Sequence, residues 1–277
     1  MYKVRKVLNN NALLVIDTDK MQEIIFIGTG VGFNKKTNMI VDIDKNTVTS
    51  YVQKKGIDIS KQVEKNDAIY LEIANEIIGE AAKVFNNFDR NIIITLADHI
   101  AFAIQRINSG LVISNPFKND IKLLFAEEYE IAKNSVGIIN NKCHIIINED
   151  EISYITLHIH SARSDMKIDQ SLMMATIINE AVSEIEKIMD ISIDVNSLAY
   201  NRLLTHLKYL ILRCKMKEKL KIDMDEYTKK AFPTSYKIAK RIVDKLAKGL
   251  NIIIDDMEIG YLAIHIERIC SYKAPVH

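Results

Sequence analysis

The sequence predicts a multidomain protein, in which a small antiparallel β-sheet N-terminal domain that dimerises is followed by two tandem all-α helical-bundle domains. Residues 1–55 contain short β-branched segments separated by turn formers, which is the pattern of strands. Residues 56–277 contain long segments with apolar residues at helical spacing and few breakers. An internal repeat divides this helical part into domains at 56–168 and 169–277.

The N-terminal domain is predicted from four strand-like segments, residues 4–8, 12–17, 23–27 and 47–51. Turn formers connect them, namely the triplet Asn9–Asn11, the run Asp17–Lys20 and the glycine cluster Gly28–Gly32. A sheet this small buries little apolar surface alone, because domains of about 60 residues are marginally stable. We therefore expect it to pair with a second copy as a homodimer.

The helices are predicted from apolar residues that recur at i, i+3, i+4 and i+7. Residues 92–107 show this spacing clearly, and similar stripes cover five other segments: 67–85, 171–189, 198–212, 236–247 and 257–269. The region after Lys54–Gly56 is therefore expected to be nearly all helix.

The helical part contains two copies of one sequence pattern. LADHIAFAIQR (96–106) aligns with LLTHLKYLILR (203–213), and YITLHIH (154–160) aligns with YLAIHIE (261–267). Both alignments have the same offset of 107 residues, which pairs His99 with His206 and His158 with His265. The two copies are expected to be domains of the same fold, joined near residues 166–170.

The composition argues against a membrane protein, a disulfide-bonded protein and a zinc protein. No window approaches the ~20 apolar residues of a membrane-spanning helix, so we expect a soluble, cytoplasmic protein. Cys143, Cys214 and Cys270 lie far apart without a CxxC spacing, which argues against disulfides and zinc. Residues 1–55 hold nine Lys and Arg against five Asp and Glu, a net +4, which leaves −3 for the rest of the chain. The two parts are expected to meet different partners.

The repeated histidines are the main candidates for chemistry. A single histidine is more often a buried, hydrogen-bonded helix residue, but a packing role does not require two of them in each copy at equal separation. On a helix, the side chains of His158 and His160 lie about 200° apart and cannot share a metal. The sequence also lacks HExxH, GxSxG and P-loop motifs, so neither an enzyme, a metal site nor a bound cofactor is expected.

Phosphorylation is the remaining chemistry for these histidines. Four arginines lie within a few turns of them in the sequence: Arg106, Arg163, Arg213 and Arg268. A phosphoryl group would be attracted by guanidinium groups and repelled by Asp98, which precedes His99. Each arginine taken singly could equally belong to a solvated helix face.

The N-terminal domain carries groups suited to RNA. Lys3, Arg5 and Lys6 supply charge, the asparagine triplet can read base edges, and Phe33 can stack on an unpaired base. The triplet could also be a simple hairpin turn. Basic residues beside a stacking aromatic favour single-stranded or looped RNA over duplex DNA.

These segments together resemble a known family. VRKVLNNNALLVID and EIIFIGTGVGFNKK resemble the co-antiterminator (CAT) RNA-binding domain, and the four histidine motifs resemble two PTS-regulation domains (PRDs). The resemblance covers essentially the whole chain and identifies it with the BglG/SacY/LicT sugar-operon antiterminators. It implies a CAT dimer that binds a leader RNA hairpin and prevents a terminator from forming.

The resemblance also implies roles for individual residues. The implied RNA-binding residues are Lys6, Asn11, Gly28, Thr29, Gly30 and Phe33. The implied phosphorylation sites are His99 and His158 in the first PRD and His206 and His265 in the second. The phosphoryl donors would be HPr and a sugar-specific Enzyme II of the phosphotransferase system (PTS). First-PRD phosphorylation would inhibit and second-PRD phosphorylation would activate.

Two departures from the family pattern concern the RNA-binding loop. Thr29 replaces the usual basic residue between two glycines, and Thr37–Met39 replaces the usual Gly-Asp after the lysine pair. An alternative is therefore a PRD regulator that acts mainly through protein–protein contacts and binds RNA weakly or not at all. A metal-dependent enzyme built on His158 and His160 is a third class, which stoichiometric bound metal would reveal.

Overall fold

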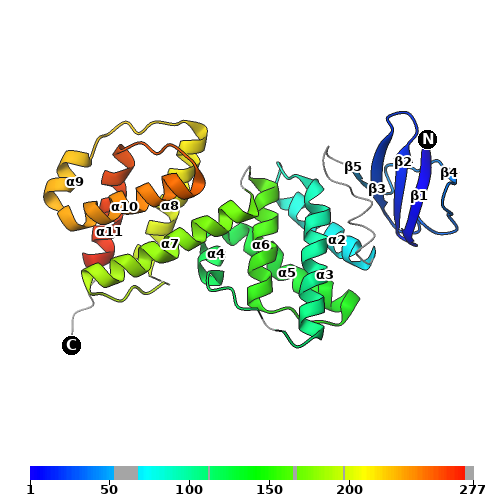
Figure 1. The fold of residues 1–277 in the computed structure, drawn as a ribbon, viewed down its shortest axis with the longest axis horizontal. Coiled ribbons are helices and arrows are strands. Elements are labelled where there is room, and N and C mark those ends of the chain that lie inside the picture. Colours follow the sequence, from blue (N-terminus) through cyan, green and yellow to red (C-terminus); the bar gives the residue numbers. More distant parts are fainter. Residues whose placement is uncertain (53–67, 112, 165–166, 196, 272–277) are drawn as a thin grey trace. The chain divides into compact units, whose positions relative to one another are not determined.

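The computed structural model describes residues 1–52, 68–111, 113–164, 167–195 and 197–271. The chain forms two compact units, Met1–Asn115 with Glu127–Asp165, and Pro116–Ala126 with Met166–His277. The first unit contains an antiparallel sheet and helices, and the second is helical (Figure 1). The predicted boundary between residues 55 and 56 lies outside the described residues, as do Asp165 and Met166 at the predicted joint.

The sheet consists of five antiparallel strands in the order β4-β1-β2-β3-β5. Their bounds are Tyr2–Asn9 (β1), Ala12–Asp17 (β2), Gln22–Ile27 (β3), Ile40–Val41 (β4) and Thr49–Val52 (β5). Asn9 pairs with Ala12, so Asn10 and Asn11 form a two-residue hairpin turn. The last two residues of the triplet are thus a turn, and its first residue ends β1.

Both faces of the sheet are buried within the chain, which explains why β2 is an unbroken apolar run. Alternate residues of a strand face opposite sides. Leu13 and Val15 join one cluster with Phe26, against which Val31, Ile43 and Val48 pack. Ala12, Leu14 and Tyr51 join the cluster of the first helices. Part of the apolar surface of the sheet is therefore buried by the helices of the same chain, and the expected homodimer stays a prediction.

The helices of the first unit pack around one apolar core. They are α2 (Ala68–Val84), the 3₁₀ turn η1 (Arg90–Ile92), α3 (Ile93–Asn108), α5 (Ala126–Cys143) and α6 (Glu149–Arg163). The α6 helix begins at a capping side chain, since Asn148 accepts a hydrogen bond from the Glu151 amide. The α2 and α6 helices both pack against α3, which places the residues of α3 opposite those of α6.

The second unit repeats this arrangement with its own helices. They are α4 (Lys118–Leu124), α7 (Ile168–Met189), α8 (Leu198–Met216), α9 (Asp225–Ala231), α10 (Pro233–Leu250) and α11 (Met257–Ser271). The α11 helix packs against α8, as α6 does against α3. The α4 helix belongs to this unit, because buried Asp120 accepts hydrogen bonds from Tyr200 and Asn179. The predicted β-sheet domain followed by helical domains is confirmed.

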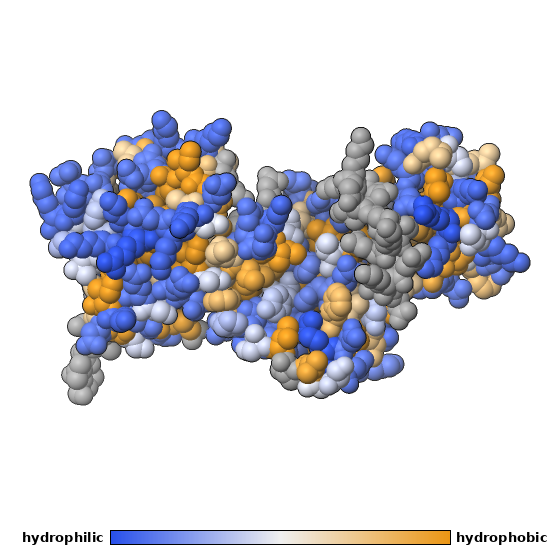
Figure 2. Space-filling model, viewed as in Figure 1, coloured by the Kyte–Doolittle hydropathy of each residue, from blue (hydrophilic) through white to orange (hydrophobic). Residues whose placement is uncertain are grey.

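Hydrophobic side chains on the surface occur in separate patches. Figure 2 shows one face of the molecule as mostly hydrophilic with scattered hydrophobic areas. Within the described residues, no helix combines the length and apolar character that a membrane crossing requires.

Candidate functional site

The first histidine cluster lies where α3 faces α6. The rings of His99 and His158 have centroids 5.1 Å apart, and Tyr154 lies 5.8 Å from the His99 ring. Arg106 donates hydrogen bonds from Nη2 to both carboxylate oxygens of Glu151, at 2.8 and 3.0 Å. The Nε2 atom of His99 lies 3.4 Å from the same carboxylate. Two predicted phosphorylation sites are thus adjacent, beside a buried ion pair.

The second cluster has the same composition, between α8 and α11. The rings of His206 and His265 have centroids 4.5 Å apart, and Tyr261 lies 6.4 Å from the His206 ring. Arg213 donates from Nε and Nη2 to the two oxygens of Glu258, at 2.8 and 2.7 Å. His206 Nε2 is 3.7 Å from this carboxylate. The four predicted histidines therefore form two matching pairs.

The carboxylates of these clusters were missed by the sequence analysis. Glu151 and Glu258 have side chains only 3% exposed, and each holds the arginine of its cluster. The 107-residue offset pairs them in the sequence, where both begin the pattern Glu-Ile-x-Tyr-x-x-x-His. Extending the repeat by three residues before the tyrosines would have found them.

The environment lowers the pKa of three clustered histidines and favours their uncharged form. Burial, with a smaller contribution from His99, lowers the pKa of His158 to about 3. Burial, with contributions from His265 and Arg213, lowers the pKa of His206 to about 3. Burial and then Arg268 and Arg202 lower the pKa of His265. A neutral imidazole has one nitrogen with a free lone pair, which can attack phosphorus.

The carboxylate of the first cluster stays ionised. Burial acts to raise the pKa of Glu151, but His99 and Arg106 outweigh it and hold that pKa below its ordinary value. A negative charge therefore faces His99 at neutral pH.

His160 and Arg163 belong to a different place in the first unit. His160 Nδ1 lies 3.1 Å from buried Glu128, and Arg163 donates to Glu127 and Glu128 and lies over the ring of Phe85. Our grouping of Arg163 with the phosphorylation sites is therefore wrong. Five residues separate it from His158, which turns it about 140° away on α6. His158 and His160 lie about 200° apart on α6, so the ring of His158 contacts His99 and the ring of His160 contacts Glu128.

Among the described residues, no group of three or more His, Cys, Asp or Glu side chains could hold a metal ion. Cys143 and Cys214 are free thiols.

The lowered histidine pKa values predict a loss of stability in acid. Below pH 6.5 the unfolded chain binds protons on His158 and His206, whereas the folded chain resists them until about pH 3. The free energy of unfolding should therefore fall as pH drops through this window, by at most about 1.4 kcal/mol per pH unit for each histidine. Urea denaturation at several pH values measures it. The double variant His158→Gln, His206→Gln should have a shallower pH dependence, and an unchanged slope would contradict the assignment.

The predicted RNA-binding residues gather where the β1–β2 turn meets the loop after β3. The backbone amide of Gly28 donates to Asn11 O and that of Gly30 to Asn11 Oδ1, both at 2.9 Å. The amide of Gly32 donates to Asn10 O, also at 2.9 Å. A Cβ on Gly32 would come within 2.0 Å of the Asn9 carbonyl oxygen, so this close contact requires glycine. The structure thus brings Asn11, Gly28 and Gly30 together.

The remaining predicted residues surround this junction. Phe33 is 60% exposed, which leaves its ring available for stacking. Thr29 is exposed on the loop, and Lys6 is exposed on β1 three residues before Asn9.

Asn9, the first residue of the predicted asparagine triplet, also belongs to this junction. Asn9 accepts a hydrogen bond from the Asn11 amide at 2.8 Å and donates from Nδ2 to Glu72 of α2 at 2.6 Å. The Nδ2 atom of Asn11 lies 3.4 and 3.5 Å from the same carboxylate. The run of three asparagines in the sequence already pointed to this position. The carboxylate of Glu72 on α2 thus accepts hydrogen bonds from the side-chain amides of Asn9 and Asn11.

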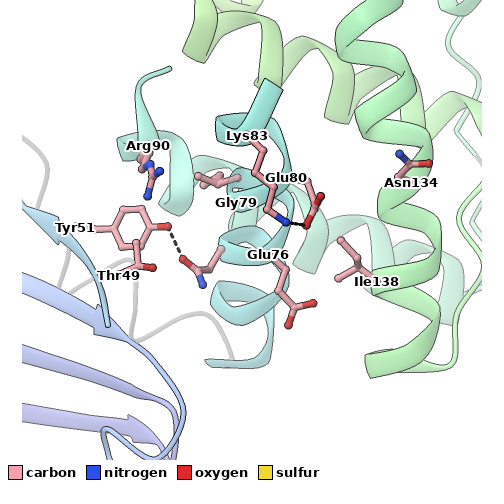
Figure 3. A pocket seen from close by; sticks show the side chains of 11 residues that line it. Thr49, Tyr51, Glu76, Gly79, Glu80, Lys83, Arg90, Asn134 and Ile138 are labelled. Atoms are coloured by element: carbon pink, nitrogen blue, oxygen red, sulfur yellow. Dashed lines mark hydrogen bonds and ion pairs between the residues drawn. The ribbon is translucent and has the colours of Figure 1, made fainter. Parts of the chain in front are cut away.

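A separate cavity of about 460 Å³ lies between β5, α2 and α5 (Figure 3). Tyr51 donates a hydrogen bond to Asn75 at 2.6 Å, and Lys83 pairs with Glu80 at 2.6 Å. None of the predicted site residues lines it. The hydrogen bond from Tyr51 to Asn75 joins the sheet to α2 at this cavity.

Comparisons with known proteins agree with this arrangement. The model of the CAT RNA-binding domain matches residues 2–56, and that of the PRD domain matches 72–162 and 179–269. The chain is 34% identical to Protein GlcT of Staphylococcus haemolyticus (strain JCSC1435), over 96% of this chain and 95% of the relative. It is also 34% identical to the GlcA/glcB genes antiterminator of Staphylococcus carnosus (strain TM300), over 96% and 94%.

A solved structure adds to this evidence. The crystal structure of GlcT CAT-PRDI aligns with a TM-score of 0.51 and 36% identity, covering 59% of this chain and 98% of that one. The chain belongs to the BglG/SacY/LicT family of transcriptional antiterminators, in which a CAT RNA-binding domain precedes two PRD domains.

Proposed function

We propose that this protein is an antiterminator of a sugar-utilisation operon, which binds a leader RNA hairpin and is controlled by PTS-dependent phosphorylation of its histidines. The observation that carries the proposal is the pair of matching histidine clusters behind a CAT domain. We assign the CAT domain to residues 1–55 and the PRDs to 56–168 and 169–277. The protein acts as a cytoplasmic homodimer, without catalysis, cofactor or metal of its own.

The RNA site consists of the Asn11 turn, the loop from Gly28 to Phe33, and Lys6. Its support is the hydrogen-bonded junction between turn and loop, which holds Asn11 against the loop that carries exposed Thr29 and Phe33. Amide groups there can meet base edges, and the phenyl ring can stack on an unpaired base. Because Glu72 occupies the amides of Asn9 and Asn11, RNA must displace that carboxylate to reach them.

In this phosphorylation reaction a phosphohistidine of a PTS protein donates its phosphoryl group to a histidine of one of the clusters. The unprotonated nitrogen of the neutral acceptor ring attacks phosphorus, and the donor P–N bond breaks. The proton on the other nitrogen of the acceptor ring is released and the departing donor imidazole takes up one. The low pKa of His158 and His206 supports this step, because it keeps their rings unprotonated at neutral pH.

Three substitutions in the CAT domain test RNA binding. Asn11→Ala and Phe33→Ala should each weaken binding to the cognate leader hairpin by about 1–3 kcal/mol, because they remove a base contact and a stacking platform. Thr29→Arg should strengthen binding by adding a phosphate contact. Electrophoretic mobility shifts with residues 1–55 and with the full chain measure these effects. Equal binding to duplex DNA of matched length would refute the RNA assignment, and unfolding of Phe33→Ala would make Phe33 a packing residue.

The polarity of regulation is tested in a reporter that carries the leader hairpin and terminator. His99→Ala or His158→Ala should give antitermination without inducer, because the inhibitory phosphoryl group can no longer form. His206→Asp or His265→Asp should favour a tighter dimer, which sedimentation measures. The assigned polarity is reversed if His99→Ala abolishes antitermination in a folded protein while His206→Ala leaves it constitutive.

The alternative function, regulation through protein contacts with little RNA binding, is favoured by one surface. The α8 helix exposes a row of apolar side chains beside the second cluster: Leu198, Tyr209, Leu212 and Met216. Such a row is suited to a partner protein or a second copy. Failure of the CAT domain to bind any leader hairpin, with PRD phosphorylation intact, would select this alternative.

A further inference from the structure

The two histidine clusters differ at two positions that the repeat aligns. The position one turn before the first histidine is Thr95 in the first unit and Arg202 in the second. The position one turn after the last histidine is Ser161 in the first unit and Arg268 in the second. The second cluster therefore has two additional guanidinium groups on the helices that carry its histidines, α8 and α11.

In the first unit the hydroxyl groups at these positions point back to their own helices. Thr95 donates to the carbonyl oxygen of Ile92 at 3.0 Å, and Ser161 donates to that of His158 at 2.8 Å. They offer no positive charge to a phosphoryl group on His99 or His158.

In the second unit the two arginines are available to an anion. Within the described residues, no hydrogen bond or ion pair engages Arg202 or Arg268, whereas Arg213 is held by Glu258. Both act on His265, since their charges lower its pKa after the larger effect of burial. Arg202, Arg213, His206 and His265 also line one open hollow of about 390 Å³, which has room for a phosphoryl group.

The net charges around the two pairs of histidines consequently differ. In the first cluster Arg106 is paired with Glu151, so these two charges cancel. In the second, where Thr205 replaces Asp98, three arginines are set against Glu258, for a net charge of +2. A dianionic group is therefore attracted by the second set and gains no net attraction from the first.

We propose that Arg202 and Arg268 form a phosphate-holding pair for a phosphoryl group on His265, and that the first cluster, which lacks this pair, is destabilised when it is phosphorylated. The inference rests on the proposed function, which makes the histidines phosphoryl acceptors. It extends that function by naming positioning residues that give the two PRDs opposite responses.

Phosphoramidate tests the pair without any partner protein. The unprotonated nitrogen of His265 attacks its phosphorus, the P–N bond breaks, and ammonia leaves with the proton given up by the other ring nitrogen. Mass spectrometry of the full chain maps the modified histidines and their initial rates. Arg202→Gln and Arg268→Gln should each lower the rate at His265 about tenfold, since each removes a charge-assisted contact to the dianion. Arg202→Lys should retain part of the rate, and added salt should diminish the difference.

Two further variants make the test specific. Arg241→Gln removes an arginine of the same unit that pairs with Glu184, and it should leave the rate at His265 unchanged. Thr95→Arg with Ser161→Arg transfers the pair to the first cluster and should raise the rate at His158 about tenfold. Thermal unfolding of the unmodified variants confirms that each is folded. On phosphorylation, the wild-type second unit should gain thermal stability and Arg202→Gln should lose that gain.

The outcomes separate this inference from the proposed function. Equal rates at His265 in wild type, Arg202→Gln and Arg268→Gln would overturn the phosphate-holding pair while leaving histidine phosphorylation intact. If neither phosphoramidate nor PTS proteins modify any histidine of the two clusters, the proposed function fails and this inference fails with it.

Discussion

Replacing Arg213 by methionine is expected to destabilise the second unit by about 3–5 kcal/mol, because it leaves the carboxylate of Glu258 buried without its partner. Glu258 is 3% exposed and receives two hydrogen bonds from the guanidinium group. Methionine retains most of the aliphatic volume, so the loss is mainly electrostatic. Urea denaturation of the full chain, followed by circular dichroism, measures the change in the free energy of unfolding.

Two further variants isolate the buried charge. Removing both charges with Arg213→Met and Glu258→Leu should recover most of the stability, since no unpaired ion is left. Arg241→Met breaks an ion pair with Glu184 in which the arginine is 61% exposed, and it should cost only about 0–1 kcal/mol. If Arg213→Met costs no more than Arg241→Met, solvent reaches Glu258 and the ion pair does not hold the cluster together.

The secondary structure was predictable where one face of a segment is apolar. The stripes at 67–85, 92–107 and 171–189 correspond to α2, α3 and α7 within a few residues. The α5 helix was missed because its buried face includes polar Glu128 and Ser135, which weakens the apolar stripe. The β4 strand has only two residues, too few for an alternating pattern. The place of α4 in the second unit depends on Tyr200 and Asn179, far from it in the sequence.

The candidate sites were predictable to the extent that the repeat marks them. The four histidines were found because they recur at one offset, and the structure brings them together in pairs. The partners of the arginines could not be predicted from nearness in the sequence. Arg106 binds Glu151, which is 45 residues away, and Arg163 binds Glu127 and Glu128 on α5. Such pairs arise from helix packing, which spacing along one helix does not reveal.

The other large effect is expected from a substitution at Gly32 in the CAT domain. Replacing Gly32 by alanine should weaken binding of the leader hairpin by about 2–6 kcal/mol, the combined contribution of Asn11 and Phe33. The added Cβ would lie 2.0 Å from the backbone oxygen of Asn9, so the loop must move away from the turn. That movement breaks the amide contact from Gly32 to Asn10 and strains the contact from Gly30 to the Asn11 side chain. The overpacking should also cost the domain about 1–3 kcal/mol of stability.

Gly30→Ala is the matched control, because it lies in the same loop with open space around its Cβ. Its φ of +72° makes alanine unfavourable by about 1–2 kcal/mol, but nothing forces the loop from the turn. Hairpin affinity measured by mobility shift should therefore fall much further for Gly32→Ala than for Gly30→Ala, with both proteins folded by circular dichroism. Equal losses in the two variants would show that the contact between loop and turn does not position Asn11 and Phe33 for RNA.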